Sequence, residues 1–89
     1  MNMQDTSLDA YYNKILPYLS NKQRAIIIFF LHHKNCNYTN AEISQKIGWP
    51  INTVTPRVLE LRELGKLEKA CRRLCTVTHN SAYAWRLVL

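Results

Sequence analysis

Residues 40–67, NAEISQKIGWPINTVTPRVLELRELGKL, decide the fold of this chain. Thr39 precedes this stretch, and Glu42 follows Thr39 by three positions, which is the spacing of a capping box. A helix is therefore predicted to begin at Asn40, because the threonine oxygen can accept from the first turn. Gly48 can adopt the left-handed conformation that ends a helix, so a tight turn is expected there.

A second helix is predicted over residues 52–64, where apolar side chains recur at helical spacing at Val54, Val58, Leu61 and Leu64. Gly65 supplies the stop signal, and an extended segment follows it. Because Pro56 is harmless only in a first turn, the regular helix is expected to begin near Asn52 or Thr53. The stretch thus predicts two helices, a tight turn between them, and a strand directly after the second helix.

The outward surface of the second helix suggests a function. Helical geometry directs four side chains away from the apolar stripe, those of Asn52, Pro56, Leu59 and Glu63. The amino-terminal half is polar and uncharged or basic, which favours its insertion into the major groove of DNA. Asn52 suits adenine, Arg57 suits guanine or phosphate, and the methyl groups of Thr53 and Thr55 suit thymine. The alternative is that these residues only cap and solvate a surface helix.

Composition and charge agree with a nucleic-acid partner. The chain has 89 residues, of which 47% are hydrophobic, so one folded domain is expected. Its net charge is +6, and residues 51–89 hold seven Lys/Arg against three Asp/Glu. A surface of this kind binds phosphates and releases their counterions, which gives affinity that does not depend on sequence.

The cysteines indicate a reducing compartment, and a cytoplasmic location is expected. Cys36, Cys71 and Cys75 are odd in number and lack the spacing of a disulfide framework. Cys71, Cys75 and His79 recur at every fourth position, but no C-x-x-C pair supports a zinc site. We expect neither a metal nor a cofactor. Residues 1–6 are polar and residues 25–31 form too short an apolar run to cross a bilayer, so no signal peptide and no membrane partner are expected.

Two further helices are predicted before the central stretch. Ser7 can cap a helix from Leu8 to about Leu16, where Pro17 interrupts it. The apolar face of this helix includes Tyr11 and Tyr12, which either pack on the core of the same chain or form a homodimer surface. Ser20 and Gln23 repeat the capping-box spacing and begin a strongly apolar helix over residues 21–34, which should be central.

The carboxyl-terminal part predicts a β-hairpin. Residues 67–77 and 82–89 are extended in pattern, and the turn-forming residues 78–81 separate them. In the second strand the bulky side chains of Tyr83, Trp85 and Leu87 are expected to face the core. Basic residues along the hairpin would meet phosphate or enter the minor groove, and the alternative is a solvated basic edge strand.

At this point the chain resembles a known family. The motifs T-N-A-E-I-S-Q-K-I-G, N-T-V-T-P-R-V-L-E-L-R-E-L-G-K-L and A-Y-A-W-R-L are similar to those of the winged-helix superfamily, in particular MarR-like regulators and small bacterial or phage winged-helix proteins. The resemblance covers roughly residues 20–89, with residues 1–19 as an extra amino-terminal helix. It implies a mainly α fold with a small β-hairpin, a recognition helix over residues 52–64, a wing over residues 69–84, and duplex DNA as partner.

The prediction is therefore a small transcriptional or phage-regulatory protein that binds duplex DNA sequence-specifically and is not an enzyme. The residues expected to contact DNA are Asn52, Thr53, Thr55, Pro56, Arg57, Lys69, Arg72, Arg73, His79 and Asn80. The alternative is a winged-helix module that binds another protein, for example a phage protein bound to a host enzyme. Exposed Leu59, Pro56, Tyr11 and Tyr12 would serve that role, since fold alone does not fix function.

Overall fold

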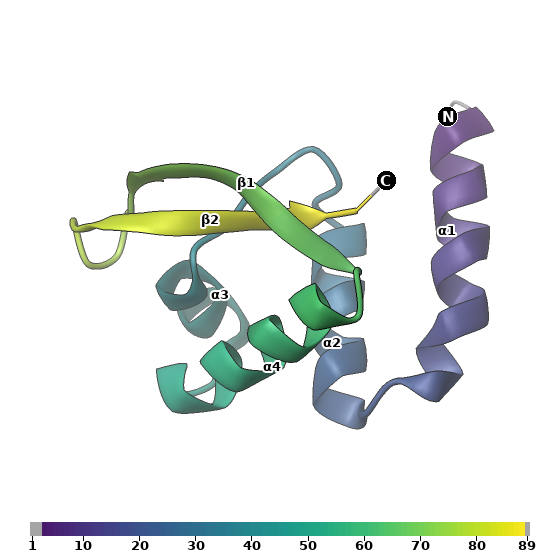
Figure 1. Ribbon diagram of the computed structural model, residues 1–89. Coiled ribbons are helices and arrows are strands. Elements are labelled where there is room, and N and C mark those ends of the chain that lie inside the picture. The colour runs from purple at the N-terminus through teal and green to yellow at the C-terminus, as the bar shows by residue number, and fades with distance from the viewer. Residues whose placement is uncertain (1–2, 89) are drawn as a thin grey trace.

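The computed structural model describes residues 3–88 and shows a mainly helical fold with one hairpin (Figure 1). The elements in chain order are α1 (Met3–Ile15), the 3-10 helix η1 (Leu16–Tyr18), α2 (Asn21–Leu31), α3 (Asn40–Ile47), α4 (Ile51–Glu63), β1 (Leu67–Leu74) and β2 (Ser81–Leu87). We call residues 67–87, which comprise β1, β2 and the loop between them, the wing. The predicted fold class, mainly α with a small β-hairpin and an extra amino-terminal helix, is confirmed, and the arrangement is compatible with a winged helix-turn-helix.

The helix caps follow the sequence closely. Both capping boxes form: the side chains of Ser20 and Thr39 accept from the third backbone amide of α2 and α3, while Gln23 and Glu42 reach back to the cap. Gly48 ends α3 with a φ of 87°, as the left-handed stop predicted. The turn into α4 is therefore short, and it holds α3 and α4 against each other.

Three predicted boundaries were wrong. The first helix begins at Met3, so Ser7 lies inside the helix and is not its N-cap residue. Helix α2 ends at Leu31, because residues 32–35 form turns in place of a last helical turn through Lys34. Helix α4 begins at Ile51 with Pro50 as its cap, which places Pro56 beyond the first turn. Pro56 is exposed, so its ring points to solvent at the helix surface.

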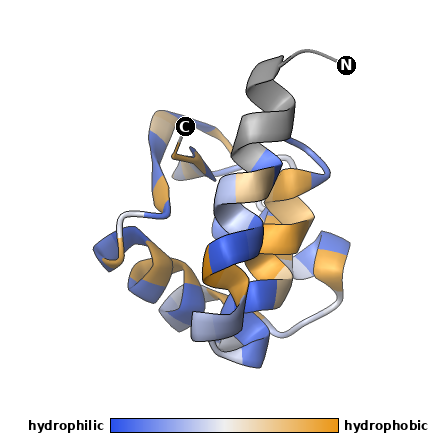
Figure 2. Ribbon diagram, turned by 90° about the vertical axis from the view of Figure 1, so that its right-hand side faces the viewer, coloured by the Kyte–Doolittle hydropathy of each residue, from blue (hydrophilic) through white to orange (hydrophobic). Residues whose placement is uncertain are grey.

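The core lies where α2, α3 and α4 meet the hairpin. Buried apolar side chains come from all four α-helices and both strands, including Ile26, Ile27, Phe30, Ile43, Val54, Val58, Leu61, Leu67 and Leu87. Figure 2 shows α1 in front of the hydrophobic residues of α2. Tyr12 of α1 is fully buried in this core, and its hydroxyl donates to the carbonyl oxygen of Val88 at 2.7 Å. The expectation that Tyr12 serves as an exposed docking residue was wrong, because its ring packs in the core and its hydroxyl has a hydrogen-bond acceptor there.

The hairpin is antiparallel and contains a β-bulge. Lys69 pairs with Trp85 and Cys71 pairs with Ala84, so Ala70 is the extra residue. Both strands are shorter than predicted, and a loop over residues 75–80 replaces the last residues of the first strand. Tyr38 adds an isolated antiparallel bridge to Trp85, with N···O distances of 3.0 and 2.8 Å. The sequence analysis missed this third extended segment, because one bridging residue leaves no periodic pattern.

One predicted core residue of β2 faces solvent. Trp85 and Leu87 are buried as expected, but the Tyr83 side chain is 42% exposed. Tyr83 lies on the same face of the hairpin as Trp85, since side chains two apart share a face. The tip of the hairpin extends past the helices in Figure 1. Tyr83 belongs to the half of β2 nearest the loop, and its side chain is only partly covered. The alternation of bulky side chains thus correctly predicted which face of β2 they share. It did not predict how far along the strand the core covers that face.

Candidate nucleic-acid interface

Helix α4 presents its amino-terminal half to solvent. Asn52, Thr55, Pro56 and Leu59 are exposed, whereas Val54, Val58 and Leu61 are buried on the opposite side. The first turn of α4 contains no acidic residue. Amide and hydroxyl groups therefore lie on an open helix end that carries the positive end of the helix dipole, which is suited to an anionic partner.

Two basic residues on the wing are held over an aromatic ring. The Lys69 ammonium lies 3.9 Å from the ring centre of Tyr83, and the Arg72 guanidinium lies 4.9 Å from it. Arg72 also donates from Nε to the Ser81 hydroxyl at 3.0 Å. The hydrogen bond from Arg72 and the charge of Lys69 lower the pKa of the Tyr83 hydroxyl. The ring thus orders two cations that remain on the surface.

Helix α4 and the wing approach each other along one groove. Arg62 of α4 lies over the indole ring of Trp85 at 5.5 Å and brings a third cation beside the wing. The groove, of about 340 Å³, is lined by Thr39, Asn40, Ala41, Ile51, Thr55, Cys75, Thr78, Ala82, Tyr83 and Trp85. The sequence analysis missed Arg62 and Tyr83. The helical spacing of Arg62, seven residues after Thr55, was a signal that it shares the face of Thr55.

Arg57 and Thr53 lie toward the other side of α4 and are half-buried. The Arg57 guanidinium donates to Glu60 at 2.7 Å, and Glu60 also accepts from the Gln23 amide of α2 at 2.7 Å. Contact between Arg57 and a base would have to replace this ion pair. Asn52 and Thr55 are therefore better placed than Arg57 for contact with a partner.

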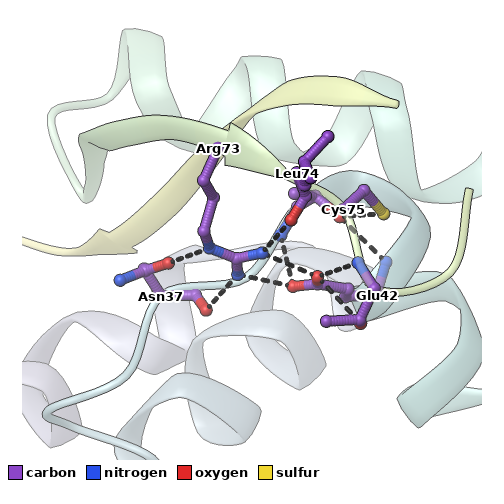
Figure 3. Close-up of polar contacts among 7 residues, drawn as sticks. Asn37, Glu42, Arg73, Leu74 and Cys75 are labelled. Atoms are coloured by element: carbon purple, nitrogen blue, oxygen red, sulfur yellow. Dashed lines mark hydrogen bonds and ion pairs between the residues drawn. The ribbon is translucent and has the colours of Figure 1, made fainter. Parts of the chain in front are cut away.

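Arg73 has partners within the chain (Figure 3). Its guanidinium donates to both carboxylate oxygens of Glu42, at 2.8 and 2.7 Å, and from Nε to the Asn37 side chain at 2.8 Å. The carbonyl oxygens of Asn37 and Leu74 accept its remaining hydrogens at 3.0 Å each. An arginine has five N–H donors, so this set leaves none for the phosphate contact that the sequence suggested.

The electrostatics of Glu42 show how strong this arrangement is. The guanidinium of Arg73 holds the pKa of the Glu42 carboxyl far below its ordinary value, against the opposing effect of burial. The amides of Thr76 and Thr39 and the Thr76 hydroxyl lower it further. Glu42 is thus an ionised, nearly buried carboxylate whose lone pairs are all engaged by donors.

The loop of the wing carries the last two predicted site residues. His79 and Asn80 are exposed, and His79 has a φ of 61°. The loop is closed by hydrogen bonds of 2.9 Å from the Cys75 amide to Asn80 and from the His79 amide to Cys75. Both side chains therefore project from a backbone that is fixed at its base.

Among the side chains of residues 9–88, no three of His, Cys, Asp or Glu come together in a way that would hold a metal ion. Residues 3–88 contain no helix with the length and hydropathy needed to span a membrane.

The class of fold is mainly helical with an antiparallel hairpin, compatible with a winged helix-turn-helix, and a solved structure of similar fold was found. It is described as a possible transcriptional regulator from Methanosarcina mazei Go1, with a TM-score of 0.69 and 16% sequence identity over 85% of this chain. The chain spans 62% of the length of that protein, and at 16% identity the likeness shows the fold alone. No protein-family model and no curated protein sequence matches the chain significantly.

Proposed function

We propose that this chain is a member of the winged-helix superfamily that binds duplex DNA sequence-specifically and regulates transcription. Helix α4 would enter the major groove by its amino-terminal half, and the wing would follow the backbone or the minor groove. The observation that carries the proposal is the exposed polar end of α4 beside the cations of the wing, across one groove. The similarity to a possible transcriptional regulator supports it.

The proposed contacts divide into two kinds. Asn52 and Thr55 would contact base edges, with Pro56 packed beside them and Thr53 at the margin. Lys69 and Arg72 would contact phosphate, joined by Arg62. The exposed loop side chains of His79 and Asn80 would extend these contacts along the duplex. Arg57 would take part only by leaving Glu60, and we assign Arg73 no phosphate contact.

Selection of duplexes from a random library, followed by a salt titration, tests the proposal. We expect a preferred duplex whose affinity exceeds that of random DNA by at least about a thousandfold, as is typical of specific binding. The proposal is overturned if no duplex binds more tightly than about 10⁻⁴ M at physiological salt, the weak limit of non-specific association.

Single substitutions then locate the base contacts. Asn52→Ala should lower affinity for the preferred duplex roughly tenfold and leave random duplexes unchanged, because a base contact carries the sequence dependence. Asn13→Ala is the matched control, since Asn13 is also an exposed helical asparagine but lies on α1. Equal losses from both variants would contradict the assignment of Asn52.

A protein partner is the second candidate, because α4 also exposes apolar side chains. Ile51, Leu59 and Leu64 are each about half exposed. Tyr11 is exposed on α1 and accepts from the Lys66 ammonium at 3.0 Å, so a homodimer through α1 would use Tyr11 without the buried Tyr12. Sedimentation of the chain at increasing concentration tests this dimer, and a monomer at all concentrations would exclude it.

A further inference from the structure

Glu42 connects three parts of the molecule through one carboxylate. It is the third residue of α3 and only 3% of its side chain is exposed. Its Oε1 accepts from the Thr39 amide at 3.1 Å and thereby completes the cap of α3. Both carboxylate oxygens accept from Arg73 of β1, and Oε2 also accepts from the amide and hydroxyl of Thr76, at 2.9 and 3.0 Å.

These contacts lie at the end of β1, where the strand passes into the loop of the wing. Arg73 is next to the last residue of β1, and Thr76 is in the loop that follows. Their partner Glu42 belongs to α3, which is joined to α4 by the short turn after Gly48. Between them, the buried Cys75 thiol lies 3.0 Å from the Thr39 hydroxyl. The contacts therefore link the base of the wing loop to the helix pair that presents α4.

From this arrangement we infer that Glu42 is a positioning residue for DNA binding, which fixes the wing relative to α4 through Arg73. The inference rests on the proposed function, because a duplex must meet α4 and the wing at the same time. When two surfaces bind one rigid partner, their relative placement sets how much affinity the second contact adds. Glu42 acts through Arg73 and Thr76 and does not itself touch DNA.

The opposite hypothesis is that Arg73 can leave Glu42 and contact phosphate. The two hypotheses predict opposite changes in DNA affinity when Glu42 is replaced. Replacing Glu42 by glutamine removes the negative charge and keeps a side chain that can complete the capping box. If Arg73 binds phosphate, its release by Glu42→Gln should strengthen DNA binding and make the salt dependence steeper. If Glu42 positions the wing, the same substitution should weaken binding and leave the salt dependence unchanged.

The first measurement reports the wing without DNA. In a Cys36→Ser/Cys71→Ser background, Cys75 is the remaining thiol, and it is 1% exposed. Burial raises the pKa of this thiol, but hydrogen bonds with Thr39 and the amides of Val77 and Thr78 outweigh burial and lower the pKa to about 7. Because the Cys75 side chain is buried, its rate of reaction with a disulfide reagent reports how often the surrounding structure opens. We expect Glu42→Gln and Arg73→Ala each to raise this rate about tenfold or more, as local opening becomes easier.

Glu68→Gln is the matched control, because Glu68 and Arg86 form the other ion pair of the hairpin, at 2.6 Å, and both are exposed. It should change neither the thiol rate nor DNA affinity. Circular dichroism at the same temperature verifies that each variant remains folded. If Arg73→Ala unfolds, the test is made with Glu42→Gln alone. Unchanged thiol rates in Glu42→Gln would overturn the inference.

The second measurement is affinity for the selected duplex over a range of salt. We expect Glu42→Gln and Arg73→Ala to weaken binding by similar factors, with parallel salt slopes and no further loss in the double variant. Tighter binding by Glu42→Gln, or a slope reduced by about one in Arg73→Ala, would overturn the inference. A wild-type chain that binds no duplex would refute the proposed function, while the thiol rates still decide whether Glu42 holds the wing.

Discussion

Arg72 and Arg73 are neighbours on β1, have identical side chains, and face opposite sides of the wing. Arg72 lies over the exposed Tyr83 ring, with the hydroxyl of Ser81 as its hydrogen-bond partner. Arg73 points to α3, where Glu42 accepts two of its hydrogen bonds and 30% of the arginine side chain remains exposed. Successive side chains of a strand point to opposite faces, so one residue of displacement separates a ligand-accessible cation from a structural one.

The comparison shows that a basic stretch is not a uniform binding surface. Three of the cations beside the groove lie against aromatic rings, which order them at low cost and leave their hydrogen-bond donors largely free. The cation on the other face is paired with a buried carboxylate, which cannot lose its partner without a large penalty. Net charge counts both kinds equally, although the five N–H donors of Arg73 are already engaged within the chain.

The largest effect is expected from removal of the carboxylate on the Arg73 side. Glu42→Ala should lower the free energy of unfolding by about 3 kcal/mol, because it leaves donors of Arg73 and Thr76 unpaired and removes the cap of α3. Urea denaturation measures this loss. Glu68→Ala, which breaks the exposed ion pair, should cost less than about 0.5 kcal/mol. Similar losses of stability in both variants would contradict the claim that the buried ion pair stabilises the fold more than the exposed one.

Low pH should reduce the stability that the pair of Glu42 and Arg73 contributes to the folded chain. The pKa of Glu42 in the folded chain lies well below its ordinary value, so the stabilisation is complete above the unfolded pKa of about 4.3 and declines as the pH falls below it. We expect Glu42 to contribute a loss of about 2 kcal/mol between pH 6 and pH 3. Thermal unfolding of wild type and Glu42→Gln over this range isolates the contribution, and parallel pH profiles would contradict it.

On the open face, the effect should appear in binding. Arg72→Ala should weaken every duplex by about 1 kcal/mol and reduce the salt slope by about 0.9, because one phosphate contact is lost without loss of a base contact. Arg86→Ala is the control, since Arg86 is an exposed arginine of β2 paired with Glu68. A sequence-dependent loss in Arg72→Ala would assign this residue to base contact instead.

The smallest effect is expected from the ring that orders the cations. Tyr83→Leu should weaken binding by about 0.5 kcal/mol, the low end for an exposed cation–π contact, because Lys69 and Arg72 lose their common support. Tyr83→Phe keeps the ring and should bind like wild type. If Tyr83→Phe and Tyr83→Leu weaken binding equally, the hydroxyl of Tyr83 is the group that matters for binding, and the ring is not.

The local sequence determined the order of the main helices and strands and several of their ends. The two capping boxes, the glycine stop at Gly48 and the apolar spacing of α4 correctly placed α3, α4 and the hairpin in order, because each depends on residues within one or two turns. The same spacing correctly placed Asn52, Pro56 and Leu59 on the exposed side of α4. Whether these residues contact DNA stays a prediction.

Only the tertiary structure decided how the charged and aromatic residues are shared between core, scaffold and surface. The pairing of Glu42 with Arg73, the burial of Tyr12 beneath the chain end, and the exposure of Tyr83 all depend on residues distant in sequence. Periodicity gives the direction of a side chain relative to its own helix or strand, and it carries no information on what stands opposite. The physical reason is that burial and ion pairing depend on two surfaces in contact. A local sequence pattern describes only one of these surfaces.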